Sequence, residues 1–299
     1  MKIIQSFWTK PGLKEANFNI SDRNMGGWVD KRFNYFSWAL SCLQLKKFYG
    51  RVELITDSAG FDLFVRKLSL PYDDVKVALD ELDLNEYHYD LWALGKLKAY
   101  SLQEEPFIHV DGDVFIFEKF SNDFENSDLL AQNAEYGFNY YEDAFKKIEE
   151  SFDYIPQVLL SSRKKNDNKV VGVNAGIVGG KNVGFFQEYS ACAFEFVNRN
   201  RSKLAQINIG LFNNVFEQFL FYAMAEKMGI SITYYLKNVN HAFDGLAELT
   251  GVPRRVRYVH TVGVYKRIAY IGDLIANRLL MDYPEYYFKI INLLRTNQL

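Results

Sequence analysis

The chain has 299 residues, with 35 lysines and arginines against 37 aspartates and glutamates, and its pI is near 6.1. This balance excludes a general attraction to nucleic acid or to an anionic membrane. No apolar run approaches the roughly 20 residues of a membrane span, and the N-terminal one is too short for a signal peptide. The two cysteines, Cys42 and Cys192, are far apart, which indicates buried free thiols in a reducing compartment. We therefore expect a cytoplasmic protein without a membrane span.

The first half of the chain alternates strand and helix patterns. The residues predict a strand at 2–8, a helix at 32–50 that stops at a glycine, a strand at 52–56, helices at 60–70 and 91–102, and a strand at 107–110. Such alternation is typical of βαβ units, and hence of a mainly parallel sheet whose faces are covered by helices.

The second half is more mixed. The residues predict strands at 129–137, 173–180, 230–236 and 256–260, a polar basic loop at 163–169, an apolar helix at 214–229 and an amphipathic helix at 283–299. The last helix could lie on a membrane surface or dock to a partner, and packing on the core is the favoured interpretation. Since no linker is evident, we expect one compact unit.

Two carboxylates stand one residue apart in the stretch FIHVDGDVFIF (Phe107–Phe117). Asp111 follows a predicted strand, and ligands of open α/β sheets bind at the carboxyl ends of strands. Side chains alternate along an extended segment, so Asp111 and Asp113 are expected on one side, and Gly112 leaves room for a ligand. Their apolar flanks indicate burial, and close buried carboxylates call for a cation such as Mg²⁺ or Mn²⁺, which also binds phosphates. The alternative is a surface turn with two solvated acids.

Four motifs along the chain resemble the GT-A glycosyltransferases, in particular the glycogenin-like and galactosyltransferase-like members of glycosyltransferase family 8. They are Asp111-Gly112-Asp113 for the family's Asp-x-Asp, LGKLKAYSL (Leu94–Leu102) for its lysine helix, NAGIVGG (Asn174–Gly180) for its Asn-Ala-Gly strand, and HTVGVYK (His260–Lys266) for its His-x-x-Gly-x-x-Lys. The chain departs from the family where Glu217-Gln218 replaces Asp-Gln and where Arg267-Ile268 replaces Pro-Trp. A separate GT-A family of uncharacterised bacterial proteins that begin with a similar strand fits equally.

The resemblance implies an α/β GT-A (nucleotide-diphospho-sugar transferase) fold, with a mainly parallel central sheet flanked by helices. It implies one glycosyltransferase domain over 1–299, with a nucleotide-binding half at 1–118 and an acceptor-binding half at 119–299. The implied reaction is metal-dependent transfer of a hexose from a UDP-sugar donor to a carbohydrate or other hydroxyl acceptor, with retention of configuration.

The resemblance also implies roles for single residues. Asp111, Asp113 and His260 would hold the metal, and an imidazole beside carboxylates suits Mn²⁺ somewhat better than Mg²⁺. Lys266 would neutralise the departing diphosphate, and Gly263 would let the loop backbone pass close to the phosphate oxygens. The alternatives are an ordinary partly buried histidine and a solvated lysine.

A second group of residues is implied at the donor sugar. Glu217 would hold sugar hydroxyls, and Gln218 would lie near the reacting face of the anomeric carbon. Lys96 would lie near the donor sugar and phosphate, Asn174 would bind sugar hydroxyls, and Gly176 is small enough to admit the ring. The alternatives are an exposed glutamate on a helix, a solvated lysine and a core strand with a bulge at the glycine.

Two residues at predicted strand ends are further candidates for the nucleotide. Trp8 could stack on uracil, and Asp57 could contact the base or ribose, as strand-end acids do in nucleotide-binding folds.

Two other classes of protein stay open. A haloacid-dehalogenase-type phosphatase also has Asp-x-Asp after a strand, although near the start of its chain, and a non-catalytic nucleotide-sugar-binding protein could have the GT-A fold.

Overall fold

The computed structural model of the chain describes residues 1–12, 26–83 and 85–299. These residues form two compact units, each built from segments that are far apart in the sequence. Unit 1 comprises Met1, Leu82–His109 and Ser121–His241, and unit 2 comprises Lys2–Glu81, Val110–Phe120 and Ala242–Leu299. The expected single domain with halves at 1–118 and 119–299 stays a prediction.

Unit 2 contains a parallel run of strands and an antiparallel pair. The parallel strands are β1 (Lys2–Phe7), β2 (Val52–Thr56) and β3 (Asp74–Val77), and the antiparallel pair is β5 (Val114–Ile116) with β11 (Tyr258–His260). Its helices are α1 (Lys31–Tyr49), α2 (Ser58–Phe61), α10 (Ala269–Asp282) and α11 (Pro284–Arg295). Its shorter turns are the 3₁₀ turns η1 (Lys10–Gly12), η4 (Leu79–Glu81), η7 (Leu249–Gly251) and η8 (Tyr265–Arg267), and the π-helical η3 (Asp62–Lys67).

Unit 1 is richer in helices. Its strands are β4 (Phe107–Val110, of which the last residue belongs to unit 2), β6 (Leu129–Ala131), β7 (Ala134–Tyr136), β8 (Val171–Val173), β9 (Ile177–Gly180) and β10 (Ile232–Tyr234). Its helices are α3 (Ala93–Ser101), α4 (Asn122–Glu125), α5 (Asn139–Ser151), α6 (Gln157–Lys165), α7 (Val183–Arg199), α8 (Ile209–Asn213) and α9 (Leu220–Met228), with the 3₁₀ turn η5 (Arg201–Gln206) and the π-helical η6 (Asn214–Phe219). Strand β6 pairs parallel with β10 and antiparallel with β9, and β7 pairs antiparallel with β8.

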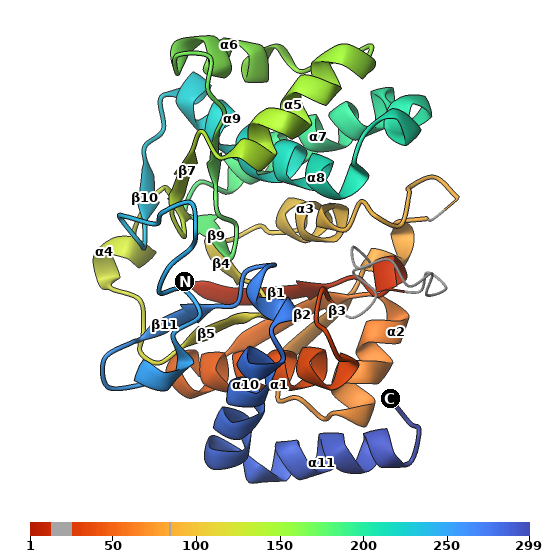
Figure 1. Ribbon diagram of the computed structural model, residues 1–299, viewed down its shortest axis with the longest axis vertical. Helices are drawn as coiled ribbons and strands as arrows, with labels where there is room; N and C mark the ends of the chain where they lie inside the picture. Colours follow the sequence, from red (N-terminus) through yellow and green to blue (C-terminus); the bar gives the residue numbers. More distant parts are fainter. Residues whose placement is uncertain (13–25, 84) are drawn as a thin grey trace. The chain divides into compact units, whose positions relative to one another are not determined.

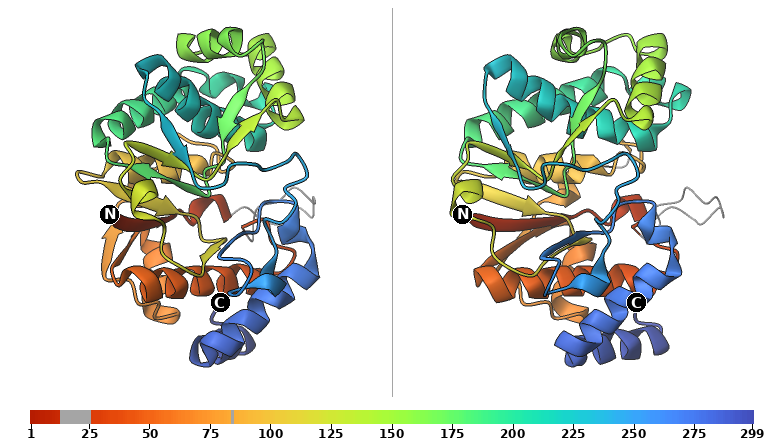
Figure 2. Two further views of the ribbon diagram at one scale, coloured as in Figure 1. Left: turned by 90° about the vertical axis from the view of Figure 1, so that its left-hand side faces the viewer. Right: turned by 60° about the vertical axis from the view of Figure 1, so that its left-hand side comes forward.

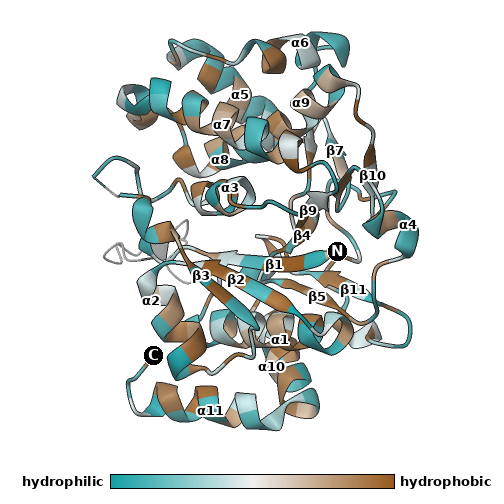
Figure 3. Cartoon of the chain, turned by 180° about the vertical axis from the view of Figure 1, so that it is seen from behind, coloured by the Kyte–Doolittle hydropathy of each residue, from teal (hydrophilic) through white to brown (hydrophobic). Residues whose placement is uncertain are grey.

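The expected fold class is confirmed, since the chain is α/β with a mostly parallel sheet flanked by helices. In unit 2, α1 packs against β2 and against α10 and α11, as Figure 1 and both views in Figure 2 show. Figure 3 shows apolar residues in the strands of this unit and in its helices, and the buried core is formed by α1 together with residues of β2, β5, α10 and α11.

Helix α1 illustrates how the sequence sets the bounds of an element. Asp30 caps its start by accepting a hydrogen bond from the backbone N–H of Arg32. Gly50 ends it with φ at 72°, a left-handed conformation that glycine adopts without steric cost, as the sequence predicts. Between these caps the helix buries Phe33 and Phe36 in the core of unit 2.

Three predicted elements differ from the structure. The strand expected at 129–137 is two strands, β6 and β7, and the one expected at 173–180 is β8 and β9 with a turn between them. The basic segment expected as a loop at 163–169 begins inside α6, because its first three residues complete the last turn of that helix. Basic residues at a helix C-terminus are favourable, and composition alone does not separate them from a basic loop.

The cysteines and the last helix largely follow expectation. Both cysteines are free, but only Cys42 is buried, while Cys192 is half-buried. Helix α11 packs on α1 and α10 and buries Ile290, whereas Phe288 is exposed. Membrane contact by this helix stays a prediction. In the described part of the chain, every helix is too short or too polar to cross a bilayer.

Candidate functional site

The two aspartates lie on a tight turn that follows β4. The backbone N–H of Val114 donates to the carbonyl of Asp111 at 3.1 Å, so the segment is bent, and the expected extended conformation is wrong. Two hydroxyls of helix α1 hold this turn: Ser37 donates to the carbonyl of Gly112 at 2.7 Å, and Ser41 donates to that of Asp111 at 3.3 Å. The turn is therefore fixed by its packing on α1.

Gly112 is needed for a different reason from the one the sequence suggests. A Cβ atom at this position would overlap the indole of Trp38, which lies directly against the glycine. The ring of Trp38 in turn contacts that of Phe7, with centroids 5.0 Å apart. The indole of Trp38 thus fills the space beside Gly112, and the expectation that this glycine leaves room for a ligand is wrong.

A strand from the C-terminal part of the chain brings His260 to this turn. Strand β11 runs antiparallel to β5, which puts His260 opposite Val114, the residue after Asp113. The next residue, Thr261, donates its backbone N–H and its hydroxyl to the carbonyl of Asp113 at 3.1 and 3.2 Å. These bonds fix the position of the imidazole relative to the carboxylate.

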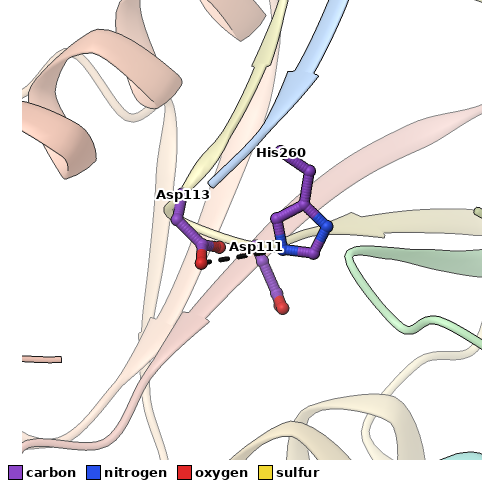
Figure 4. Close-up of side chains that lie close together, drawn as sticks. All are labelled: Asp111, Asp113 and His260. Atoms are coloured by element: carbon purple, nitrogen blue, oxygen red, sulfur yellow. Dashed lines mark ion pairs between the residues drawn. The ribbon is translucent and has the colours of Figure 1, made fainter. Parts of the chain in front are cut away.

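The result is a cluster of three metal-binding side chains within unit 2. Ligand atoms of Asp111, Asp113 and His260 all lie within 4.8 Å of one another, and the imidazole Nε2 is 3.6 Å from Oδ2 of Asp113 (Figure 4). Two carboxylates and an imidazole are a donor set that suits Mn²⁺ and other divalent cations. Asp113 and His260 are buried, which restricts competition from water. The residues therefore fit the divalent ion that the sequence motifs imply.

Lys266 joins this cluster. Its ammonium lies 2.6 Å from Oδ2 of Asp113 and donates to the carbonyl of Gly26 at 3.0 Å. Burial by itself raises the pKa of Asp113, but the charges of Lys266 and His260 outweigh it and hold the pKa below its usual range. Asp113 is thus held ionised, and in the free protein the ammonium of Lys266 is its cation. Gly263, in the loop between these residues, is exposed, and a Cβ there would meet no other atom.

A second cluster lies within unit 1 and is built on a buried ion pair. Lys96 of α3 lies 2.7 Å from Oε1 of Glu217 in η6, and the two side chains are only 9% and 1% exposed. The ammonium also donates to the carbonyl of Ala175 at 3.1 Å, and the backbone carbonyl of Glu217 accepts from the hydroxyl of Tyr189 at 2.5 Å. The exposed helix position considered for Glu217 is therefore wrong.

The other predicted sugar-site residues lie around a buried carboxylate of unit 1. Asn174 and Gly176 lie in the turn between β8 and β9, so the strand expected there is wrong. The side chain of Asn174 accepts a hydrogen bond from the backbone N–H of Gly176 at 3.1 Å, which supports the turn. Asn174 donates to Glu135 at 2.9 Å, and Gln218 is in contact with the hydroxyl of Tyr141, which is also 2.9 Å from Glu135.

The two strand-end candidates lie in unit 2. Both carboxylate oxygens of Asp57 are engaged: one accepts from the backbone N–H of Gly60 and caps α2, and the other accepts from the N–H and hydroxyl of Thr9. These bonds account for its burial without a ligand. Trp8 is 7% exposed, so little of its ring is open to a base, and its indole N–H has no hydrogen-bond partner among the described residues. Nucleotide contacts by both residues stay predictions.

Sequence reasoning missed several residues that build the two clusters. Ser37 and Ser41 hold the aspartate turn, and Glu135 and Tyr141 connect the sugar-site candidates. The serines have no pattern beyond a spacing of one helical turn. Glu135 is the only charged residue between Asp128 and Glu142, and that could have marked it as a buried group with specific partners.

Comparisons with known proteins place these observations in context. The model of a family of unknown function (DUF6734) matches residues 1–293. No curated protein matches the chain. Among solved structures, it is similar to the galactosyltransferase LgtC in complex with donor and acceptor sugar analogs, with 12% identity and a TM-score of 0.44 over 93% of this chain and 96% of that chain.

Two further solved structures are similar at the same level. An active-site mutant of LgtC has 12% identity and a TM-score of 0.43 over 87% of this chain and 86% of that one. Mouse xyloside xylosyltransferase 1 in its apo form has 10% identity and a TM-score of 0.44, over 87% and 96%. The resemblance to glycosyltransferases is thus found again among structures, but at these values it says nothing of what this chain acts on.

Proposed function

The chain belongs to DUF6734, a family of unknown function, and we propose that it is a metal-dependent glycosyltransferase that moves a hexose from a UDP-sugar to an acceptor hydroxyl. The observation that carries this proposal is the cluster of Asp111, Asp113 and His260, whose ligand atoms lie within 4.8 Å of one another. The ammonium of Lys266 on Asp113 supports it, because a cation and an ammonium side by side suit a diphosphate.

In the proposed reaction, the bond from the anomeric carbon to the diphosphate breaks, and a bond from that carbon to the acceptor oxygen forms. Asp111, Asp113 and His260 would hold a divalent cation, which supplies charge stabilisation for the leaving UDP. Lys266 adds a positive charge at the same oxygens, and charge placed in advance of the reaction lowers its barrier. The departing phosphate is a suitable acceptor for the proton of the attacking hydroxyl.

Further roles belong to the same proposal. Glu217 would bind hydroxyls of the donor sugar, and Lys96 would lie near the sugar and its phosphate. Asn174 and Gln218 would also lie at the sugar. The reaction would retain the anomeric configuration. The buried pair of Lys96 and Glu217 supports such a role, because ionised groups are seldom buried without a function or a partner. The acceptor is proposed only as a hydroxyl compound, and the cytoplasm is the proposed location.

The phosphatase alternative is not favoured. That chemistry needs further carboxylates to complete a magnesium site beside the Asp-x-Asp. In this chain the groups found next to Asp113 are an imidazole and an ammonium. A binding protein without catalysis is an outcome of the experiment below.

Thermal unfolding with nucleotide sugars tests the proposal directly. We expect UDP-sugars with Mn²⁺ to raise the melting temperature, and Mn²⁺ or the UDP-sugar alone to raise it less, because a ligand that binds the folded state stabilises it. UDP release with and without candidate acceptors then measures turnover. Stabilisation by GDP- or CMP-sugars and not by UDP-sugars would contradict the donor, and binding without any UDP release would indicate a binding protein.

Replacing Lys266 by glutamine is expected to have opposite effects on two ligands. In the free protein the ammonium already occupies Oδ2 of Asp113, so its removal should tighten Mn²⁺ binding about tenfold, which corresponds to about 1.4 kcal/mol. Binding of UDP in the presence of Mn²⁺ should weaken about tenfold, because a phosphate contact is lost. Calorimetric titration measures both constants. Arg267→Gln, a neighbouring exposed cation, is the control. Weakening of both ligands would point to a disturbed site instead.

Replacing Gly263 by alanine separates a loop role from a ligand role. A Cβ at this position meets no atom of the protein, so stability should be unchanged or rise by about 0.4–1 kcal/mol. If the loop backbone lies against phosphate oxygens, the methyl group should weaken UDP–Mn²⁺ binding several-fold. Gly112→Ala is the contrast, since its Cβ would overlap Trp38 and should destabilise the fold. Unchanged UDP binding in Gly263→Ala would remove Gly263 from the site.

A further inference from the structure

Glu135 is a buried carboxylate held by neutral donors. It lies in β7 with no exposed surface, and three side chains donate to it. Asn174 donates to Oε1 at 2.9 Å, and the hydroxyls of Tyr140 and Tyr141 donate to Oε2 at 2.5 and 2.9 Å. An ionised carboxylate accepts hydrogen bonds only, so these three donors match its chemistry. One of these donors, Asn174, is itself a residue that the proposed function places at the sugar, and a second, Tyr141, contacts another such residue, Gln218.

The hydroxyl of Tyr141 connects Glu135 to Gln218. It lies 2.9 Å from Oε2 of Glu135 and in close contact with the amide oxygen Oε1 of Gln218. Gly172 makes room for it, because a Cβ at that position would overlap the tyrosine hydroxyl. Burial, and next the charge of Glu135, raise the pKa of Tyr141 well above its usual value, so the hydroxyl keeps its proton.

This hydroxyl has one proton and two acceptors to satisfy. If it donates to Glu135, no proton is left for the Oε1 of Gln218 that faces it in the structure, and the contact is favourable only when the amide is turned so that its NH₂ group faces the tyrosine. The oxygen and nitrogen of a glutamine amide have nearly the same shape, so the hydrogen-bond network decides which of them faces the tyrosine. Because Glu135 also accepts from Asn174 and Tyr140, the carboxylate fixes the direction of the whole chain of bonds.

We propose that Glu135 is a positioning residue, which fixes Asn174 directly and Gln218 through Tyr141, so that Gln218 presents its carbonyl oxygen to the donor sugar. This inference rests on the proposed function and deepens it. Gln218 is half-buried, so part of its amide is open to a ligand, whereas Glu135 is fully enclosed and cannot touch one. Asn174 is held at both ends, by Glu135 and by the backbone of Gly176.

A double-mutant cycle tests the link between Tyr141 and Gln218. The rate measured is UDP release from the UDP-sugar that most stabilises the wild-type protein with Mn²⁺, and every variant is also checked by thermal unfolding. Tyr141→Phe is expected to lower kcat about tenfold, the size of one lost hydrogen bond, with little change in KM. In a Gln218→Ala background the same change should have almost no further effect, because the two residues act as one unit.

Tyr140→Phe is the matched control. Its hydroxyl also donates to Glu135, but the contact between Tyr141 and Gln218 stays intact, so we expect less than about a threefold change in kcat. Should Tyr141→Phe fail to fold, Gln218→Glu serves instead. Its carboxylate offers no donor to Tyr141, and we expect a loss at least as large as that of Gln218→Ala. Wild-type kcat in Gln218→Glu would overturn the proposal.

The outcomes separate this inference from the proposed function. Additive effects of Tyr141→Phe and Gln218→Ala in an active protein would overturn the positioning role and leave the glycosyltransferase proposal intact. A wild-type protein that neither binds UDP-sugars nor releases UDP would overturn both. A loss of kcat in Tyr140→Phe as large as that in Tyr141→Phe would show that the contact of Tyr141 with Gln218 does not carry the effect, and would overturn the positioning role.

Discussion

Asp113→Asn is expected to abolish the response to Mn²⁺ and to lower sugar transfer by about 10²–10³-fold, because the charge that holds the cation at the leaving group is lost. Asp113 is the common partner of this cluster: His260 and Lys266 both contact its Oδ2, at 3.6 and 2.6 Å. Asparagine keeps the shape of the side chain. The measurements are the Mn²⁺-dependent shift of the melting temperature and the rate of UDP release.

Asp282 provides a matched control for the loss of a carboxylate. It lies in the same unit and is paired with Arg278 at 2.6 Å, the same distance that separates Asp113 from Lys266. Asp282→Asn should lower stability modestly and leave the Mn²⁺ response unchanged. If Asp113→Asn still showed the wild-type response to Mn²⁺, the metal would not bind at these residues, and the central proposal would be wrong.

The metal cluster could be predicted from sequence because its residues are tied to short patterns. Asp111 and Asp113 are flanked by apolar runs, and His260 and Lys266 stand in a motif with fixed spacing. The turn that carries the aspartates could not be predicted. Apolar residues on both sides indicate burial, and they are equally compatible with a continuous strand and with two strands joined by a turn.

The bend depends on partners that are remote in the sequence. The hydroxyls of Ser37 and Ser41 hold its carbonyls, and Trp38 fills the space beside Gly112. Each contact joins residues about 70 positions apart, and a single sequence has no signal for such pairs. The same limit applies to the pairing of β11 with β5, which determines how close His260 comes to Asp113.

In unit 1 the sequence indicates that Glu217 needs a partner or a function, but it does not identify the partner. A carboxylate among Phe, Leu and Met residues needs a compensating group, and the structure buries Glu217 beside one. That the group is Lys96 depends on how α3 packs in the unit. Glu135 was missed because its three donors come from α5 and from the turn after β8, and they share no spacing with it.

Lys96→Met is expected to lower the free energy of unfolding by about 3–5 kcal/mol, because it leaves the carboxylate of Glu217 buried without its cation. Both side chains of this pair are less than a tenth exposed and lie 2.7 Å apart. Chemical denaturation measures the loss. The double variant Lys96→Met with Glu217→Leu should regain most of it, since an apolar pair of similar volume also replaces the second buried charge.

The exposed pair of Lys147 and Glu150 is the control, because it has the same 2.7 Å separation while its side chains are 62% and 46% exposed. Lys147→Met should change stability little, since water screens such pairs. The double variant at Lys96 and Glu217 then isolates function from folding. If it is stable but no longer binds a UDP-sugar with Mn²⁺, the pair acts on the donor. If it is stable and binds the donor as the wild-type protein does, the pair is structural, and Glu217 has no part in holding the sugar.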